Sequence, residues 1–183
     1  MIPDSCVDFK QRKAQAWNAC NKLEKVWKSN LDRKIKIKIF KACVESILLY
    51  GSETWTITKN MEARIDGCYT KLLRRVLNIS WRDHITNKEV YDKLPLITKI
   101  IRQRRLRFAG HCIRSVDQPI SRLIFWSPTG GSVRRGRRNL TYSDTLCKDI
   151  GLDKLEITQL MRDRKIWASH VAAASSIPST DDR

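Results

Sequence analysis

The stretch MEARIDGCYTKLLRRVLNI, residues 61 to 79, decides the fold class because its apolar side chains follow the period of an α-helix. The apolar series consists of Met61, Ile65, Cys68, Leu72, Val76 and Ile79. These residues recur every three or four positions and share one face, whereas Lys71, Arg74 and Arg75 occupy other faces. The stretch therefore predicts an amphipathic helix of about five turns.

The same spacing continues toward the N-terminus. It predicts one helix over residues 9 to 29 and a second helix from about Asp32, a residue type that caps helices, to about residue 50, where Gly51 ends it. Residues 34 to 40, KIKIKIF, alternate as a strand would, but helical spacing continues beyond them. We therefore favour the helix.

A capping signal marks the first of the next two helices. Thr86 and Glu89 have the spacing of a capping box, which predicts a short helix that ends before Pro95. A longer helix is predicted over residues 98 to 114.

The C-terminal third predicts two further helices. Thr141 is a capping residue and Gly151 a stop signal, so a helix should lie between them with one buried edge. That edge consists of Tyr142, Leu146 and Ile150. The final helix spans roughly residues 157 to 174 and carries Trp167 inward.

Few segments depart from the helical spacing of apolar residues. Residues 54 to 58, TWTIT, form a short extended candidate, and residues 123 to 126 fit either a short strand or a last helical turn. Residues 127 to 139 have the composition of an exposed loop. The predicted fold is mainly α, a multi-helix bundle with a basic, arginine-rich loop and little or no strand.

The charge of the chain indicates its class of partner. The 183 residues include 36 Lys and Arg against 19 Asp and Glu, which gives a formal charge of +17. Nucleic acid is the leading candidate because its phosphates attract clustered basic side chains, and an anionic membrane surface is second. A hydrophobic fraction of 42% and six tryptophans favour a packed core over a disordered basic tail. The length predicts one domain, or one and a part.

The sequence lacks membrane and secretion signals. No run approaches the roughly 20 apolar residues that a membrane span requires, and the N-terminus has no apolar signal core. The six cysteines are widely scattered. We therefore expect an intracellular protein with reduced thiols, located in the nucleus, the cytoplasm or both.

Basic residues concentrate between residues 99 and 138, where eleven of them accompany a single acidic residue, Asp117. On a helix Arg104, Arg107 and Arg114 lie on one side, whereas Leu106, Ala109 and Ile113 lie on another. The alternative is a solvated face with surface ion pairs, but the shortage of carboxylates favours phosphate contact. The predicted nucleic-acid contacts are Arg102, Arg104, Arg105, Arg107, His111 and Arg114, with Arg134, Arg135, Arg137 and Arg138 as a flexible clamp.

The presence of two residues in this predicted helix, Gly110 and His111, needs an explanation. Gly110 in mid-helix costs about 1 kcal/mol relative to alanine, and close packing of a second helix explains it better than approach of a nucleic-acid backbone. No acidic or nucleophilic residue stands at a spacing from His111 that would indicate catalysis. We therefore interpret His111 as structural or phosphate-facing.

The sequence offers no catalytic or metal-binding pattern. Paired ligands such as Cys-x2-Cys or His-x3-His are absent, and the acidic pair Asp181 and Asp182 lies in the tail. Gly130 and Gly131 lack the strand and helix that a phosphate loop needs. We therefore predict no catalytic residue, no metal and no cofactor.

Several strings together closely resemble the region downstream of the polymerase palm in reverse transcriptases of non-LTR (LINE-type) retrotransposons, especially the RTE-like group that includes BovB. They cover nearly all of the chain, about residues 8 to 172. The strings are LLYGSETWTITK (48 to 59), IDGCYTKLLRRVLNISWRDHITNKEVYDKLP (65 to 95), RRLRFAGHCIRS (104 to 115), RRGRRNLTYSDTLCKDIGL (134 to 152) and DRKIWASHV (163 to 171).

The resemblance implies a thumb-like helical segment at residues 1 to 58, a helical C-terminal domain at residues 59 to 174 and a disordered tail at residues 175 to 183. In that family the thumb grips primer and template, and the C-terminal region helps to hold element RNA or target DNA. The catalytic aspartates of the polymerase lie upstream and have no match here, so the resemblance implies a non-catalytic fragment whose partners are RNA, DNA and the missing polymerase core.

Two other readings stay open. A host protein could have kept this helical domain to bind a partner protein through its tryptophans, or the chain could be a decayed remnant without a function. The first two helices would pack on the palm in the parent protein, so an isolated chain is expected to expose Trp17, Trp27 and Phe40. Whether RNA, DNA or a hybrid is preferred is not decided by the sequence.

Overall fold

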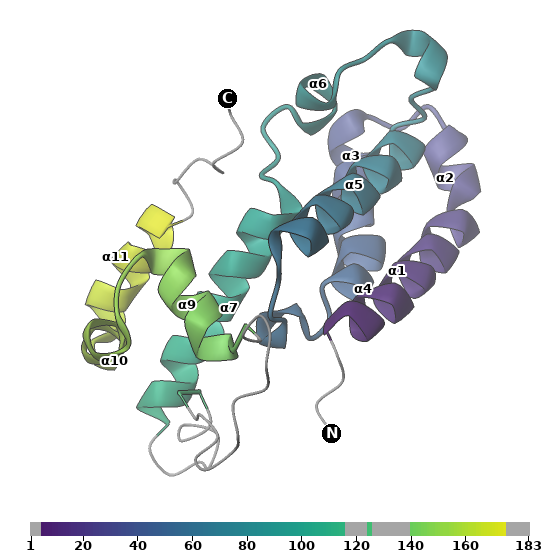
Figure 1. Cartoon of the computed structure of the whole chain (residues 1–183). Coiled ribbons are helices and arrows are strands. Elements are labelled where there is room, and N and C mark those ends of the chain that lie inside the picture. The colour runs from purple at the N-terminus through teal and green to yellow at the C-terminus, as the bar shows by residue number, and fades with distance from the viewer. Residues whose placement is uncertain (1–4, 116–123, 126–139, 175–183) are drawn as a thin grey trace. The chain divides into compact units, whose positions relative to one another are not determined.

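The computed structural model describes residues 5–115, 124–125 and 140–174, and every regular element within these ranges is a helix (Figure 1). This confirms the mainly α fold. The chain divides into two compact units. Unit 1 comprises Met1–Gly51 and Lys59–Thr98, and unit 2 comprises Ser52–Thr58 and Lys99–Arg183.

The first predicted helix is divided in two. Helix α1 (Ser5–Lys22) ends one residue before α2 (Glu24–Lys28) begins. The carbonyl of Cys20 accepts hydrogen bonds from the Leu23 N–H at 3.2 Å and from the Trp27 indole at 2.8 Å. In a continuous α-helix the Cys20 carbonyl would instead accept from the N–H of residue 24. The prediction of one unbroken helix was therefore wrong at Leu23.

The second predicted helix is confirmed, with a wider turn inside it. Helix α3 (Arg33–Phe40) continues through the π-helical turn η1 (Lys41–Glu45) into α4 (Ser46–Leu48). The Asp32 side chain caps it by accepting from the Lys34 N–H at 3.2 Å. The alternating stretch 34 to 40 is therefore helical. Residues 55–58 follow the short 3-10 turn η2 (Ser52–Thr54) without forming a strand.

Helix α5 (Lys59–Val76) packs against α1 and α3 in unit 1 and buries the predicted apolar face. It ends three residues before the predicted Ile79 because Asn78 adopts a left-handed conformation with φ of 55°. The N–H of Ile79 then bonds the carbonyl of Arg74, which is the hydrogen-bond pattern of a Schellman cap. Contrary to expectation, Trp27 and Phe40 are buried in this core, whereas Trp17 is partly exposed.

The next two predicted helices are both present, and the second of them belongs to unit 2 from Lys99 onward. A short turn, η3 (Trp81–Asp83), precedes α6 (Asn87–Tyr91), and Thr86 and Glu89 form the predicted capping box. The longer helix is α7 (Ile97–Arg114), close to its predicted limits. Both predictions are confirmed.

Unit 2 contains α9 (Tyr142–Ile150), α10 (Lys154–Arg162) and α11 (Arg164–Ala174). Thr141 and Gly151 bound α9 as predicted. The final helix, expected to be continuous, breaks at Asp163, whose carboxylate accepts from the N–H groups of Lys165 and Ile166 at 2.7 and 3.0 Å. Asp163 thus begins a new helix as its N-cap.

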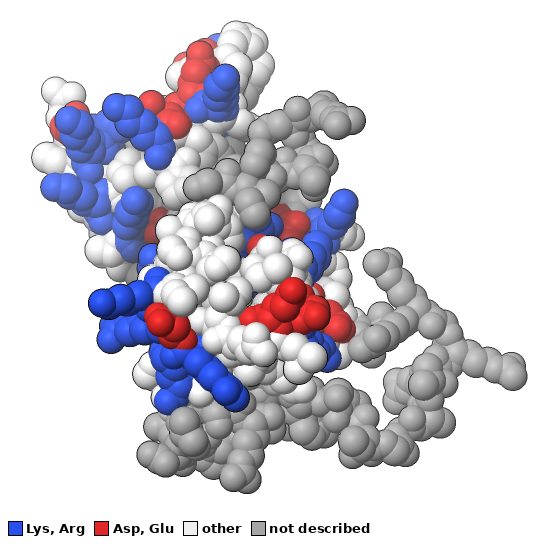
Figure 2. Space-filling model, turned by 90° about the vertical axis from the view of Figure 1, so that its left-hand side faces the viewer, with Lys and Arg blue, Asp and Glu red and all other residues white. Residues whose placement is uncertain are grey.

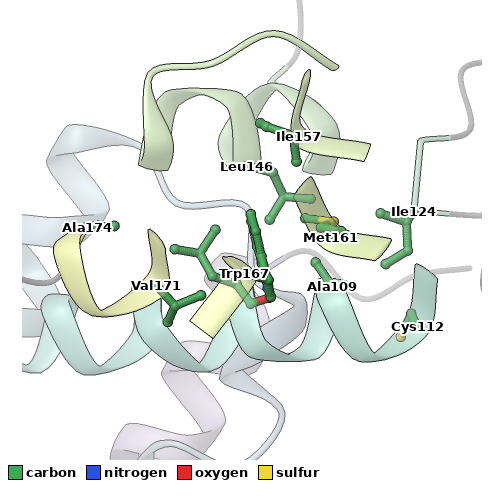
Figure 3. Packing of buried hydrophobic residues seen from close by; sticks show 10 residues of the cluster. Ala109, Cys112, Ile124, Leu146, Ile157, Met161, Trp167, Val171 and Ala174 are labelled. Atoms are coloured by element: carbon green, nitrogen blue, oxygen red, sulfur yellow. The ribbon is translucent and has the colours of Figure 1, made fainter. Parts of the chain in front are cut away.

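The core of unit 2 forms around Trp167, which lies over α7 with Leu146, Met161 and Val171 around it (Figure 3). Its indole N–H donates to the Leu106 carbonyl at 2.9 Å. A Cβ added at Gly110 would lie 2.3 Å from the indole nitrogen, closer than any side chain allows. Close packing of a second helix is therefore the reason for Gly110, as predicted.

The compact units and the predicted segments, 1 to 58 and 59 to 174, are two different divisions of the chain. Helix α5 belongs with α1 and α3, although the division placed it in the second segment. The assignment of these segments to a thumb and a C-terminal domain stays a prediction. The predicted arginine-rich loop and the predicted tail lie outside the described residues. Ile124 and Phe125, which precede the loop, form part of a turn.

Candidate nucleic-acid interface

A basic groove lies between α7 and α11 in unit 2, with a volume of about 580 Å³. Figure 2 looks from the side on which α10 and α11 lie in Figure 1, and it shows Lys and Arg side chains gathered beside a band of uncharged residues. The groove is lined by Arg107, His111 and Arg114 of α7 and by Arg164, Trp167, Ala168, Val171 and Ala172 of α11. None of these residues is acidic. We call this cavity the α7–α11 groove.

The helical period of α7 produces the cationic wall. Arg107, His111 and Arg114 stand four and three residues apart, so they lie one above another along the helix. Arg107 and His111 are exposed. The Arg114 guanidinium donates to the Met161 carbonyl at 2.7 Å, which fixes this side chain at the C-terminal end of α10.

Helix α11 supplies the opposite wall. Arg164, in the first turn after the Asp163 cap, adds an exposed cation, and Ala168 and Ala172 follow at intervals of four residues. Trp167 is only 2% exposed and supports the wall from the core. The groove therefore combines guanidinium groups, which bond phosphate oxygens two at a time, with an apolar surface that can contact a sugar or a base.

Arg105 does not belong to this surface. It is 3% exposed, and its Nη1 donates to a carboxylate oxygen of Asp149 at 2.5 Å. The Nε of Arg102 lies 3.3 Å from the other oxygen of the same carboxylate. This buried ion pair joins α7 to α9, so the prediction of Arg105 as a phosphate contact was wrong, and Arg102 is engaged within the protein as well.

The other predicted contacts divide into three groups. Arg107, His111 and Arg114 come together in the α7–α11 groove. Arg104 is partly exposed on α7 and does not line the groove. The predicted clamp, Arg134, Arg135, Arg137 and Arg138, lies outside the described residues.

Sequence reasoning missed Arg164, which completes the groove from a helix that begins 50 positions after Arg114. The sequence does contain a signal that could have found Arg164. Asp163 is a residue type that caps helices, and it predicts a separate helix with Arg164 in its first turn, near Trp167.

Other chemistry is absent from the parts of the chain that the structure describes. No three His, Cys, Asp or Glu side chains gather there as metal ligands would. None of the six cysteines, all of which lie within the described residues, forms a disulfide. Burial raises the pKa of the Tyr142 hydroxyl above its usual range, and this group donates to the Glu53 carbonyl at 3.0 Å, which is a structural role. No helix within the described ranges has the length and apolar composition of a membrane span.

The chain is 30% identical over 173 residues to an uncharacterized transposon-derived protein of Caenorhabditis elegans. The matched region covers 87% of this chain and 62% of the relative, so the chain spans less than two thirds of that protein's length. A relative of this description fits a transposon origin. No protein-family profile and no solved structure matches the chain.

Proposed function

We propose that the chain is a non-catalytic segment of a non-LTR retrotransposon reverse transcriptase that binds RNA and DNA without base specificity. The resemblance of its sequence strings to that family supports this origin, and so does the transposon-derived relative. The single observation that carries the binding function is the α7–α11 groove, which four basic side chains line without any acidic residue.

In this mechanism the guanidinium groups of Arg107, Arg114 and Arg164 bind phosphate oxygens, and His111 donates a further hydrogen bond. Arginine suits this task because its planar fork stays charged and pairs with two oxygens at once. Phosphate contacts of this kind position a strand without reading its bases, so RNA and DNA are both ligands. Binding releases counterions, and it should therefore weaken steeply as salt rises.

The chemistry of polymerisation belongs to another part of the proposed parent protein. Two-metal phosphoryl transfer requires fixed carboxylates, and in that family these lie upstream of the matched strings. The proposed role here is to hold nucleic acid for the polymerase core, which is the proposed protein partner. Such a role places the protein in the nucleus or the cytoplasm.

The test compares two triple variants of the whole chain. In R107Q/R114Q/R164Q three cations of the groove are removed, and in K148Q/R162Q/K165Q three exposed cations of unit 2 outside it are removed. The groove variant should lower the slope of log affinity against log salt by roughly 2 for single-stranded RNA and roughly 3 for duplex DNA. Equal slopes for the two variants would reject the groove, provided that circular dichroism shows both to be folded.

Docking of a partner protein is the second candidate function, and Trp81 favours it. Its side chain is 77% exposed, on a turn that Ser80 and Asp83 hold in a capping box. An exposed tryptophan on a fixed turn has the character of an interface anchor. A folded chain that binds neither RNA nor DNA at low salt would make this function, or a remnant without function, the better reading.

A further inference from the structure

Unit 1 has a second basic groove, about 260 Å³ in volume, between α1 and α5. Three exposed cations line it, Lys13 from α1 and Arg64 and Lys71 from α5. None of the lining residues is acidic. In the described part of the chain, none of these three cations forms an ion pair. Arg64 donates a hydrogen bond to the Cys6 Sγ at 3.8 Å, and no acidic side chain lines the groove, so a polyanion is the complementary ligand.

The groove also has an aromatic side chain in its wall. Trp17 is partly exposed and lines the groove together with Lys13 and the buried Cys68. Burial raises the pKa of this thiol, while the positive charges of Lys13 and Lys71 oppose the rise. The two lysines come from different helices and line the same groove. Cations around an aromatic ring are the combination that binds single strands.

Gly67 provides an independent observation. It stands in the middle of α5, where glycine is less stable than alanine, yet no atom lies within 4 Å of the position that a Cβ would occupy. Gly110 is different, because Trp167 fills the space beside it. Packing explains Gly110 and leaves Gly67 unexplained. A bare stretch of backbone next to cations allows a ligand backbone to approach closely.

Gly67 also borders a second pocket of unit 1, whose lining includes Asp66 and Asp92. Carboxylates repel phosphate, so that pocket does not suit a polyanion. The groove that holds Lys13, Arg64 and Lys71 does.

We infer that this α1–α5 groove is a second nucleic-acid site, which holds the backbone of a single strand across Gly67. The phosphates lie on Lys13, Arg64 and Lys71, and one base lies against Trp17. The small volume favours a single strand, because it admits a nucleotide-sized group and excludes the width of a duplex. None of these residues was predicted from the sequence as a nucleic-acid contact, and the inference stands independently of the α7–α11 groove.

Two variants of the whole chain test it, with fluorescence anisotropy of a labelled oligouridine RNA of about 12 nucleotides as the readout. K13Q/R64Q/K71Q removes the three cations and should lower the salt slope by roughly 2. Its control is K25Q/K38Q/K59Q, which removes three exposed lysines of unit 1 outside the groove and should leave the slope nearly unchanged apart from the lower net charge.

Gly67→Ala is the sharper variant, since it changes no charge. Alanine should raise the melting temperature, because the added methyl group meets no protein atom, and it should weaken RNA binding several-fold because the methyl group stands where the strand passes. A higher melting temperature together with weaker RNA binding cannot come from general damage to the structure.

The inference is overturned if Gly67→Ala binds the RNA as tightly as the unchanged chain, or if the groove and control triple variants have the same salt slope. The two proposed sites remain distinguishable. Loss of binding in R107Q/R114Q/R164Q alone would support the α7–α11 groove and reject this one, whereas loss in K13Q/R64Q/K71Q alone would do the reverse. Loss in both variants supports two sites.

Discussion

The two units each place a basic groove between two helices, but they use their cations and their mid-helix glycines in different ways. In unit 2, Arg114 bonds the Met161 carbonyl, Arg102 and Arg105 pair with Asp149, and Gly110 receives Trp167. The arginine-rich helix is therefore partly a structural element. In unit 1, the cations of the α1–α5 groove form no ion pair within the described chain, and the space beside Gly67 is empty.

This difference shows that a density of basic residues along the sequence is a poor guide to which of them can meet a ligand. The stretch from residue 99 to 138 is the most basic of the chain, yet one of its arginines is buried. The α1–α5 groove collects its cations from two helices about 50 residues apart, where no local concentration draws attention to them.

The largest expected effect concerns the structural use of arginine in unit 2. Asp149→Asn removes the charge that compensates buried Arg105 and should lower the free energy of unfolding by about 3–5 kcal/mol. Urea unfolding followed by circular dichroism measures this loss. Replacing both partners, in R105M/D149L, should cost much less, because no buried charge is then left alone. Equal losses in the two variants would show that packing, and not charge, dominates here.

Gly110→Ala should destabilise unit 2 by about 1–3 kcal/mol, because its methyl group overlaps the Trp167 indole and displaces the hydrogen bond to Leu106. Urea unfolding again provides the measurement, with the near-ultraviolet circular dichroism of tryptophan as a check on local packing. A variant as stable as the unchanged chain would contradict the packing of α11 on α7.

Gly67→Ala should have the opposite sign and a smaller size, a gain of about 0.5–1 kcal/mol, because alanine fits the open space of an exposed helix position. Gly110→Ala serves as the matched control, since both variants replace a mid-helix glycine by alanine and differ only in the surroundings of the added methyl group. A loss of stability at residue 67 would remove the distinction between the two glycines.

The smallest effect is a pH dependence in unit 1. Burial raises the pKa of Asp66 above its usual 3.8, although hydrogen bonds from Thr98 partly oppose the rise. A carboxyl group with a raised folded pKa binds its proton more tightly in the folded state, so its contribution to stability falls as pH rises from 3.8 through the folded value and is constant above it.

Urea unfolding of the unchanged chain and of Asp66→Asn across this window tests that sign. The stability of the unchanged chain relative to the variant should decrease as pH rises. An increase would show that the Thr98 hydrogen bonds outweigh burial.

Much of the helical fold could be predicted from local signals. The period of α5, the Thr86–Glu89 box and the Thr141 and Gly151 boundaries each depend on residues within one or two turns. The break at Leu23 could not be predicted in this way, because a side chain four residues later, Trp27, takes the Cys20 carbonyl. The break at Asp163 was readable, since an aspartate that caps a helix needs no glycine or proline beside it.

The candidate sites were less predictable. Arg105 and Asp149 are 44 residues apart, and only the packing of α9 on α7 reveals that they pair. Helical periodicity grouped Arg107 with Arg114 correctly on one face, but it could not show that α11 brings Arg164 to the same groove. The face of a helix on which a residue lies follows from the local sequence. Which other helix packs beside that face depends on the tertiary fold.

The most direct test of nucleic-acid binding measures the unchanged chain with a labelled single-stranded RNA and a duplex DNA at about 50 and 200 mM salt, with circular dichroism to verify helix. About six phosphate contacts predict that duplex affinity falls by about 10³-fold across this range. A fall of that size supports phosphate binding by the basic grooves. A folded chain that binds neither ligand at the lower salt concentration would contradict it.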